Sequence, residues 1–263
     1  MKINLNLKET GTSPVVIHGN GKSSRGLTIY HKIINEFLSN ETPTETMDTK
    51  DITIVSWKGG KYKDTETILE TFMRFYDFPI VMLDWPENTN FWEGSKSKVT
   101  KTLEAINNGL IKTKYVMWFD AGDVGLLRHP HELLEKYKEH YSDYDLVFNA
   151  EKNNYPTPER MAPVSDDLNS RFEEIKKLDE EKTHGSSYKY LNSGCLIGKT
   201  ETLKTFLEHA STIGLDEPIN DTVMCRIAQY DMKDKVCVDN LCKLFVCLYN
   251  VSDNEIEIGV SDE

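Results

Sequence analysis

Apolar and polar residues alternate along the chain with two different periods. Short runs rich in β-branched and aromatic residues, bounded by polar or turn-forming residues, predict strands. Between them, apolar residues recur every three to four positions, which predicts helices. The predicted strands cover residues 14–18, 52–56, 79–83, 115–119, 146–148, 190–197 and 244–248, and the predicted helices cover residues 27–38, 64–76, 98–110, 131–140 and 166–182. This alternation favours an α/β fold with a mostly parallel sheet flanked by helices.

One polar segment interrupts the pattern. Residues 39–46 are rich in Ser, Asn, Thr, Glu and Pro and show no periodicity, which is typical of a linker. Order resumes at Asp51. A chain of 263 residues suits one large domain or two small ones. We expect a single domain over residues 1–263, made of a first segment (1–40), a connection (41–50) and a core (51–263).

Charge and composition restrict the partners. The formal net charge is −12, so the protein repels polyanions and nucleic acid is not expected to bind. No apolar run is long enough to span a bilayer, and the first residues lack the apolar run of a signal peptide. The charged helix over residues 166–182 is expected on the solvated surface. The five cysteines include no Cys-x-x-Cys pair, so we expect buried, reduced thiols rather than a zinc site, and a cytoplasmic location.

The first candidate for chemistry is Asp120-Ala121-Gly122-Asp123, which follows an apolar predicted strand. In open α/β sheets, ligands bind beyond the carboxyl ends of the strands. Two carboxylates on a tight loop can face one hard cation, and oxygen ligands suit Mg²⁺ or Mn²⁺. The alternative is structural, with Asp120 as a cap and Asp123 as a turn residue.

The second candidate is His18-Gly19-Asn20-Gly21, which follows another predicted strand. Glycines permit close backbone approach to a phosphate, and successive N–H groups can form an anion-binding nest. Lys22 can add a positive charge. His18 can complete a metal site, and an imidazole ligand shifts the preference from Mg²⁺ towards Mn²⁺. The alternative is an ordinary Asn-Gly turn.

Two further polar pairs stand out. Asn192 and Ser193 interrupt the apolar segment over residues 190–198, so their side chains are expected to be hydrogen-bonded to the backbone or to a ligand. Asn220 and Asp221 stand at the start of a helical stretch. The structural alternative for Asp221 is a helix N-cap.

Four motifs occur in a characteristic order and approximate spacing between about Asp51 and Ile258. They are Asp120-Ala121-Gly122-Asp123, Phe148-Asn149-Ala150-Glu151 with Tyr155-Pro156, Tyr190-Leu191-Asn192-Ser193-Gly194, and Asn220-Asp221. Together with the His-Gly-Asn-Gly loop, they resemble the glycosyltransferase domain of the procollagen lysyl hydroxylases and related collagen glucosyl- and galactosyltransferases. The resemblance implies a GT-A-type, Rossmann-like nucleotide-sugar-binding fold.

The resemblance also implies a UDP-sugar donor held on Mn²⁺ by Asp120, Asp123 and His18. It gives every other candidate residue an expected role near the donor. Ser56 and Trp57 would receive the nucleoside, and Gly19, Asn20, Gly21 and Lys22 would lie near the diphosphate. Lys98 stands where the family has a basic residue near the donor. Tyr155 would line the sugar pocket where the family usually has a tryptophan, and Asp221 and Asn192 would orient the sugar or the acceptor.

Three departures from the family pattern are visible. Gly122 stands where the family often has an aromatic residue that can stack on uracil, and Asn220-Asp221 stands where the family has two acids. The His-Gly-Asn-Gly loop comes first in this chain, whereas in the family it comes near the end. Joining Glu263 to Met1 would restore the family order, so we expect a circular permutation or one unit of a head-to-tail repeat.

The implied activity is the transfer of a hexose, glucose or galactose, from a UDP-sugar to an acceptor hydroxyl with retention at the anomeric carbon. The acceptor would be a collagen-type hydroxylysine, another protein site or a small molecule. Two other functions stay open. A non-catalytic nucleotide-sugar or glycan-binding module fits the loss of one acid at Asn220, and a UDP-sugar hydrolase would use the same donor without an acceptor.

Overall fold

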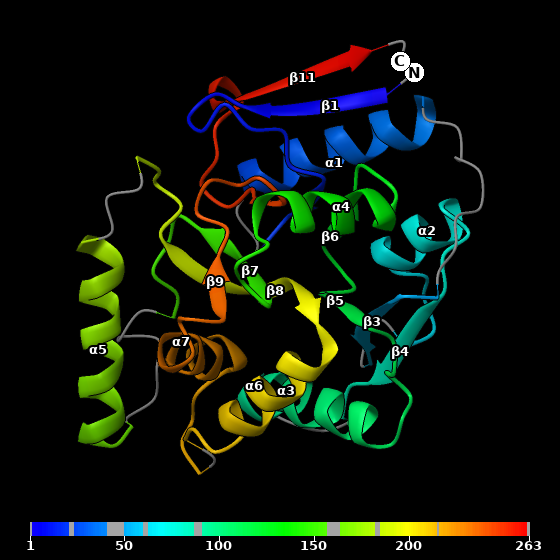
Figure 1. Cartoon of the computed structure of the whole chain (residues 1–263). Coiled ribbons are helices and arrows are strands. Elements are labelled where there is room, and N and C mark those ends of the chain that lie inside the picture. The colour runs from blue at the N-terminus through cyan, green and yellow to red at the C-terminus, as the bar shows by residue number, and fades with distance from the viewer. Residues whose placement is uncertain are drawn as a thin grey trace.

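The computed structural model describes residues 2–20, 24–40, 50–59, 63–86, 91–156, 164–181, 185–214 and 216–261. Its main sheet has six strands in the order β4 (Ile80–Asp84), β3 (Ile52–Lys58), β5 (Tyr115–Phe119), β8 (Tyr190–Lys199), β7 (Leu146–Glu151) and β9 (Val236–Val238) (Figure 1). β3 is parallel to both of its neighbours and β7 is parallel to β9, whereas β8 runs antiparallel to β5 and β7. The predicted α/β class with a mostly parallel sheet is confirmed.

A second sheet joins the N-terminal segment to the rest of the chain. Its three strands are β10 (Phe245–Cys247), β2 (Val16–His18) and β6 (Val124–Leu126), with β2 in the middle. β2 is parallel to β10 and antiparallel to β6. The strand predicted over residues 14–18 corresponds to β2, which covers only Val16–His18 and belongs to this small sheet.

A two-stranded ribbon brings the two ends of the described chain together. β1 (Lys2–Leu7) pairs antiparallel with β11 (Ile256–Ser261), and Lys2 lies opposite Ser261 (Figure 1). Neither strand was predicted, although the alternation of polar and apolar residues in both segments is typical of a half-buried strand.

Helices cover both sides of the main sheet. On one side, α3, α6 and α7 pack against one another, and on the other side lie α1, α4 and the β1–β11 ribbon (Figure 1). The helices are α1 (Ser24–Asn40), α2 (Ile68–Phe75), α3 (Phe91–Asn107), α4 (Pro130–His140), α5 (Asp166–Glu181), α6 (Thr200–Ala210) and α7 (Asp221–Asp231), with a 3₁₀ turn, η3, at Asp253–Glu255. None of the described helices is long and apolar enough to cross a membrane.

Local interactions explain where two helices depart from the prediction. The helix predicted over residues 64–76 begins only at Ile68, because Thr67 and Glu70 form a capping box. The helix predicted over residues 98–110 begins earlier, at Phe91. Glycine is a poor helix former. At position 94, however, a Cβ atom would lie 2.4 Å from the Trp85 ring, so this turn of the helix needs glycine.

One continuous hydrophobic core contains residues from both the first segment and the remainder of the chain. All five residues of β5 are buried, and from α1 the side chains of Tyr30, Ile33 and Phe37 are buried. The Phe37 ring lies 5.2 Å from that of Phe72 on α2. The expected connection over residues 41–50 lies, except for Lys50, outside the described residues.

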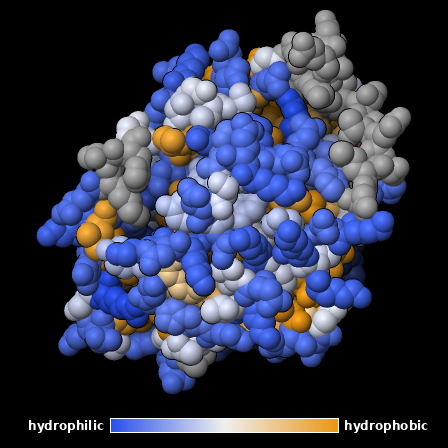
Figure 2. Space-filling view, in the orientation of Figure 1, coloured by the Kyte–Doolittle hydropathy of each residue, from blue (hydrophilic) through white to orange (hydrophobic). Residues whose placement is uncertain are grey.

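The surface is polar, and the charged helix is more deeply embedded than its sequence indicated. Figure 2 shows a mostly hydrophilic face on which apolar residues form only small separate groups. α5 buries Leu168, Phe172, Ile175 and Asp179 against the rest of the protein. Of the five free cysteines, all but Cys237 are buried, and Cys237 is half-buried.

Candidate active site

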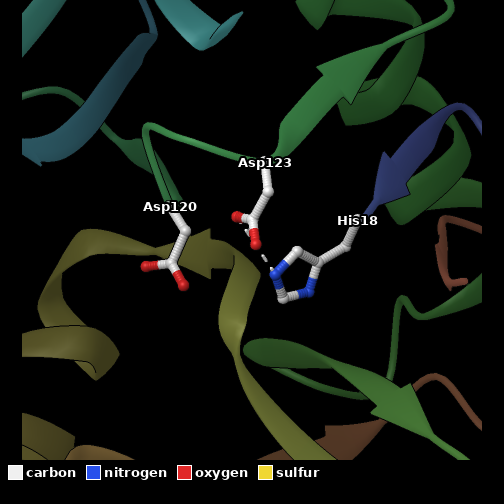
Figure 3. Close-up of side chains that lie close together, drawn as sticks. All are labelled: His18, Asp120 and Asp123. Atoms are coloured by element: carbon white, nitrogen blue, oxygen red, sulfur yellow. Dashed lines mark ion pairs between the residues drawn. The ribbon is translucent and has the colours of Figure 1, made fainter. Parts of the chain in front are cut away.

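Three side chains that are distant in the sequence converge at the ends of β2, β5 and β6. One ligand atom each from His18, Asp120 and Asp123 lies within 4.8 Å of the others (Figure 3). The His18 Nε2 atom faces Asp123 Oδ1 at 3.4 Å. Within the described ranges, this is the one group of three or more His, Cys, Asp or Glu side chains arranged closely enough to hold a metal ion.

Strand register produces this convergence. His18 lies opposite Val124, the residue that follows Asp123, and the Gly19 N–H donates to the Asp123 carbonyl oxygen at 2.7 Å. On the other side, the Asp120 N–H donates to the carbonyl oxygen of Gly194. A Cβ atom at position 194 would lie 2.3 Å from the His18 ring, so glycine there lets the imidazole lie directly against β8.

Asn149 on β7 orients the imidazole from behind. Its Nδ2 atom lies 3.3 Å from His18 Nδ1, while its Oδ1 atom is buried without a partner among the described residues. A 180° flip of the side-chain amide exchanges its oxygen and nitrogen without changing its shape. With the oxygen turned towards His18, Asn149 accepts the Nδ1 proton, and the Nε2 lone pair then points at the two carboxylates. This second arrangement is the one that suits a metal ligand.

The electrostatics of the group favour a cation. Burial lowers the pKa of His18, but the nearby carboxylates, chiefly Asp123, raise it more, so the net pKa lies above its usual value. Burial raises the pKa of Asp120, an effect that the Lys98 ammonium opposes. Partly buried carboxylates beside a buried imidazole are stabilised by any positive charge placed between them.

Next to this group lies a second charged cluster, centred on Lys98 of α3. The Lys98 ammonium is 2.6 Å from Asp120 Oδ1 and 3.3 Å from Asp221 Oδ2. Asp221 also accepts a hydrogen bond from the Ser193 hydroxyl at 2.9 Å. Asp221 and Ser193 therefore lie directly beside the pair formed by Lys98 and Asp120.

The structural alternative for Asp221, a helix N-cap, is wrong. Asn220 caps α7, because its Oδ1 atom accepts the Val223 N–H at 3.0 Å, and Asp221 is the first helical residue. Asn is among the best N-cap residues. Asn220 therefore has a local structural role as the cap of α7.

Glu151 is a functional candidate that the sequence analysis left without a role. Its buried carboxylate accepts hydrogen bonds from Asn192 Nδ2 at 3.0 Å and from Asn20 Nδ2 at 3.1 Å. Burial raises the pKa of Glu151 to about 7. The sequence does carry a signal for this residue. Glu151 is an acid at the carboxyl end of an apolar strand, and Asp120 directly follows another such strand. Asn192 also accepts the Gly194 N–H, so its amide supports the part of β8 against which His18 lies.

The remaining predicted residues lie around these clusters. Ser56 is buried and donates to the Phe119 carbonyl oxygen at 2.6 Å, which ties β3 to β5. Trp57 is buried beside Trp118, and its indole N–H has no partner among the described residues. Tyr155 is half-buried in the loop after β7. Gly21 and Lys22 lie outside the described residues.

Trp85 is an aromatic residue near the site that the sequence analysis did not single out. It follows β4, is half-buried, and has the Lys98 ammonium 5.9 Å from its ring centroid. Trp57 faces the same ammonium at 5.7 Å. Trp85, after the end of β4, therefore offers aromatic surface close to the charged clusters, whereas Trp57 is buried and Gly122 has no side chain.

The chain matches a known protein family over most of its length. The family model described as the PLOD GT domain matches residues 81–263. This chain belongs to that family. The resemblance to collagen glycosyltransferase domains is thereby confirmed. The matched range includes Asp120, Asp123 and Asp221, whereas His18 lies before it.

Two individual proteins are also similar. The chain is 25% identical over 161 residues to the protein R699 of Acanthamoeba polyphaga mimivirus, a match that covers 61% of this chain and 30% of that protein. It therefore spans less than a third of the length of that relative. A solved glycosyltransferase involved in glycosylation of the major capsid of PBCV-1 aligns with a TM-score of 0.38 and 10% identity, over 72% of this chain and 81% of the other.

Proposed function

We propose that this chain transfers a hexose from a UDP-sugar to an acceptor hydroxyl, with Mn²⁺ held by His18, Asp120 and Asp123. The observation that carries the proposal is the convergence of these three side chains within 4.8 Å in a member of the PLOD GT domain family. Two carboxylates and one imidazole suit Mn²⁺ better than Mg²⁺. When bound, such an ion stabilises the negative charge that develops on the leaving diphosphate.

The chain's own residues would bind and orient the donor. The nucleoside would lie at the ends of β3 and β4, where the half-buried Trp85 supplies aromatic surface and the buried Trp57 packs beside the Lys98 ammonium. The Lys98 ammonium can neutralise phosphate charge. Asp221, held by the Ser193 hydroxyl, would accept hydrogen bonds from sugar or acceptor hydroxyls. The Gly19 N–H is already bonded to Asp123, so phosphate contacts from this loop would begin at Asn20.

An assay of UDP release tests the proposal against its two alternatives. We expect Mn²⁺-dependent release from UDP-glucose or UDP-galactose that rises when an acceptor is present, including hydroxylysine peptides. A UDP-sugar hydrolase would release free sugar at a rate indifferent to acceptor. A binding module would bind UDP without turnover. Mass spectrometry of products from a panel of UDP-sugars and acceptors identifies donor, acceptor and anomeric outcome.

Replacing Asp221 is expected to lower turnover with little effect on nucleotide binding. Asp221→Ala should reduce kcat by roughly a hundredfold, the scale of losing one well-placed polar group. UDP affinity measured without Mn²⁺ should be nearly unchanged, because the residue would face the sugar rather than the diphosphate. Steady-state kinetics and calorimetric UDP titration measure the two quantities. Asp231→Asn, at the far end of α7 and paired with Arg171, is the matched control. A collapse of UDP affinity would assign Asp221 to the nucleotide instead.

Replacing Asn149 should change metal affinity through His18 alone. Asn149→Leu removes the group that orients the imidazole, and Mn²⁺ affinity should fall by about ten- to a hundredfold. Asn149→Asp offers a carboxylate to the same Nδ1 proton and should restore the affinity. Titration of Mn²⁺ by electron paramagnetic resonance distinguishes the two variants. Equal affinities for Leu and Asp would show that Asn149 acts only in packing.

We further propose that the chain is a circular permutation of the family's usual order. The pairing of β1 with β11 supports this, because it places the first and last strands of the described chain side by side, as a permuted order requires. The position of His18 outside the matched range 81–263 agrees with a loop that has moved from the end of the domain to its start.

A further inference from the structure

Lys98 connects the metal-binding carboxylate Asp120 to the α7 carboxylate Asp221. Its ammonium is 2.6 Å from Asp120 Oδ1 and 3.3 Å from Asp221 Oδ2. The lysine side chain is only 11% exposed, and the rings of Trp57 and Trp85 lie beside the ammonium. Charge interactions are strong where water is excluded, so this ammonium is a major part of the field at Asp120.

The position of Lys98 conflicts with metal binding. Asp120 belongs to the group with His18 and Asp123, and the ammonium occupies one of its oxygens. A divalent ion on that carboxylate would lie a few ångströms from the ammonium, and their repulsion opposes binding. Asp221, which already accepts a hydrogen bond from Ser193, offers Lys98 an alternative partner that is not one of the three metal-binding side chains.

We propose that Lys98 is an internal counter-ion that competes with the metal for Asp120 and passes to the donor diphosphate when metal and donor bind together. This inference rests on the proposed metal-dependent function. It makes metal and donor binding mutually dependent: the metal alone must displace the ammonium, whereas a diphosphate receives it. By linkage, the donor strengthens metal binding by the same factor as the metal strengthens donor binding.

A simpler role for Lys98 makes the opposite prediction. If the lysine only holds Asp120 in the geometry that the metal needs, its loss would weaken metal binding. If it competes, its loss would strengthen the binding of metal alone and reduce the gain from adding nucleotide. The sign of the change therefore separates the two roles.

The test is a titration of the full chain with Mn²⁺, followed by electron paramagnetic resonance, with and without UDP. In Lys98→Met, Mn²⁺ alone should bind about tenfold more tightly than it binds the wild type. The factor by which UDP increases Mn²⁺ affinity should fall by a similar amount, about tenfold, which lies within the usual range of coupling between sites. Lys101→Met removes an exposed charge from the same helix, paired with Glu104, and should behave as the wild type.

A second variant guards against misfolding, because Lys98→Met leaves the buried Asp221 and the half-buried Asp120 without their cation. Lys98→Met with Asp221→Asn removes one charge of each sign and keeps the net charge of the cluster. It should also bind Mn²⁺ alone more tightly than the wild type, since Asp120 is freed. Unchanged or weaker binding of Mn²⁺ alone in the folded variants overturns the counter-ion role. A wild-type protein that binds no Mn²⁺, or an Asp123→Asn variant that binds it equally well, would instead remove the metal site and this inference with it.

Discussion

An Asp123→Asn protein is expected to fold normally and to lose the Mn²⁺-dependent part of its UDP binding. Asp123 supplies the carboxylate nearest to His18 Nε2, and its side chain is about one-third exposed, so the isosteric amide disturbs little packing. An amide oxygen is a neutral and weaker ligand than a carboxylate. We expect metal affinity to fall by at least about a hundredfold, the upper end of losses seen on changing even outer groups of metal sites.

Calorimetric titration of UDP with and without Mn²⁺ measures this effect, and thermal unfolding checks the fold. Asp51→Asn is a matched control, because Asp51 is exposed just before β3, whose other end approaches the site. It should keep the affinity of the wild type. If the Mn²⁺-dependent UDP affinity of Asp123→Asn equalled that of the wild type, Asp123 would not be a metal ligand. Asp120 and His18 alone would then be too few to form the proposed site.

The sequence allowed the main sheet to be predicted because its central strands are strongly apolar and end in acids. β5 and its following Asp120 are clear from the pattern alone. β6 and β9 were missed, since three residues of Val-Gly-Leu or Val-Cys-Val carry too little signal. α6 was missed although its buried Leu203, Phe206 and Leu207 have helical spacing, because it follows β8 with no intervening loop.

The site was predictable as a set of residues but not as a geometry. The pairing of His18 with Val124 depends on the register between β2 and β6, which neither short strand encodes by itself. The role of Asn220 as the cap of α7 depends on where the helix begins. The role of Glu151 depends on the hydrogen bonds that its carboxylate accepts from Asn20 and Asn192, which lie far from it in the sequence. Tertiary contacts decide each of these points.

Deletion of residues 1–40 is expected to prevent folding. β2 is the middle strand of its sheet, so its loss leaves β10 and β6 without their shared partner. Val16, Ile17 and Phe37 are fully or almost fully buried, and each such side chain contributes about 1.5–3 kcal/mol. The whole net stability of a domain is only about 5–15 kcal/mol. Circular dichroism and size-exclusion chromatography should show an unfolded or aggregated protein without Mn²⁺ binding.

Relocating the same segment instead of deleting it provides the decisive control. A chain that begins at Lys50, runs to Glu263 and continues from Met1 to Asn40 keeps every strand pairing described here, because Lys2 and Ser261 already lie opposite each other. Chain ends that lie close together make such reordering inexpensive. We expect this protein to fold and to bind Mn²⁺ and UDP as the original does, and to lose Mn²⁺ binding when His18→Ala is introduced. A deleted protein that folds and binds Mn²⁺–UDP as tightly as the full chain would contradict the integral role of the segment. A reordered protein that fails to fold while its separate parts are soluble would contradict the permutation.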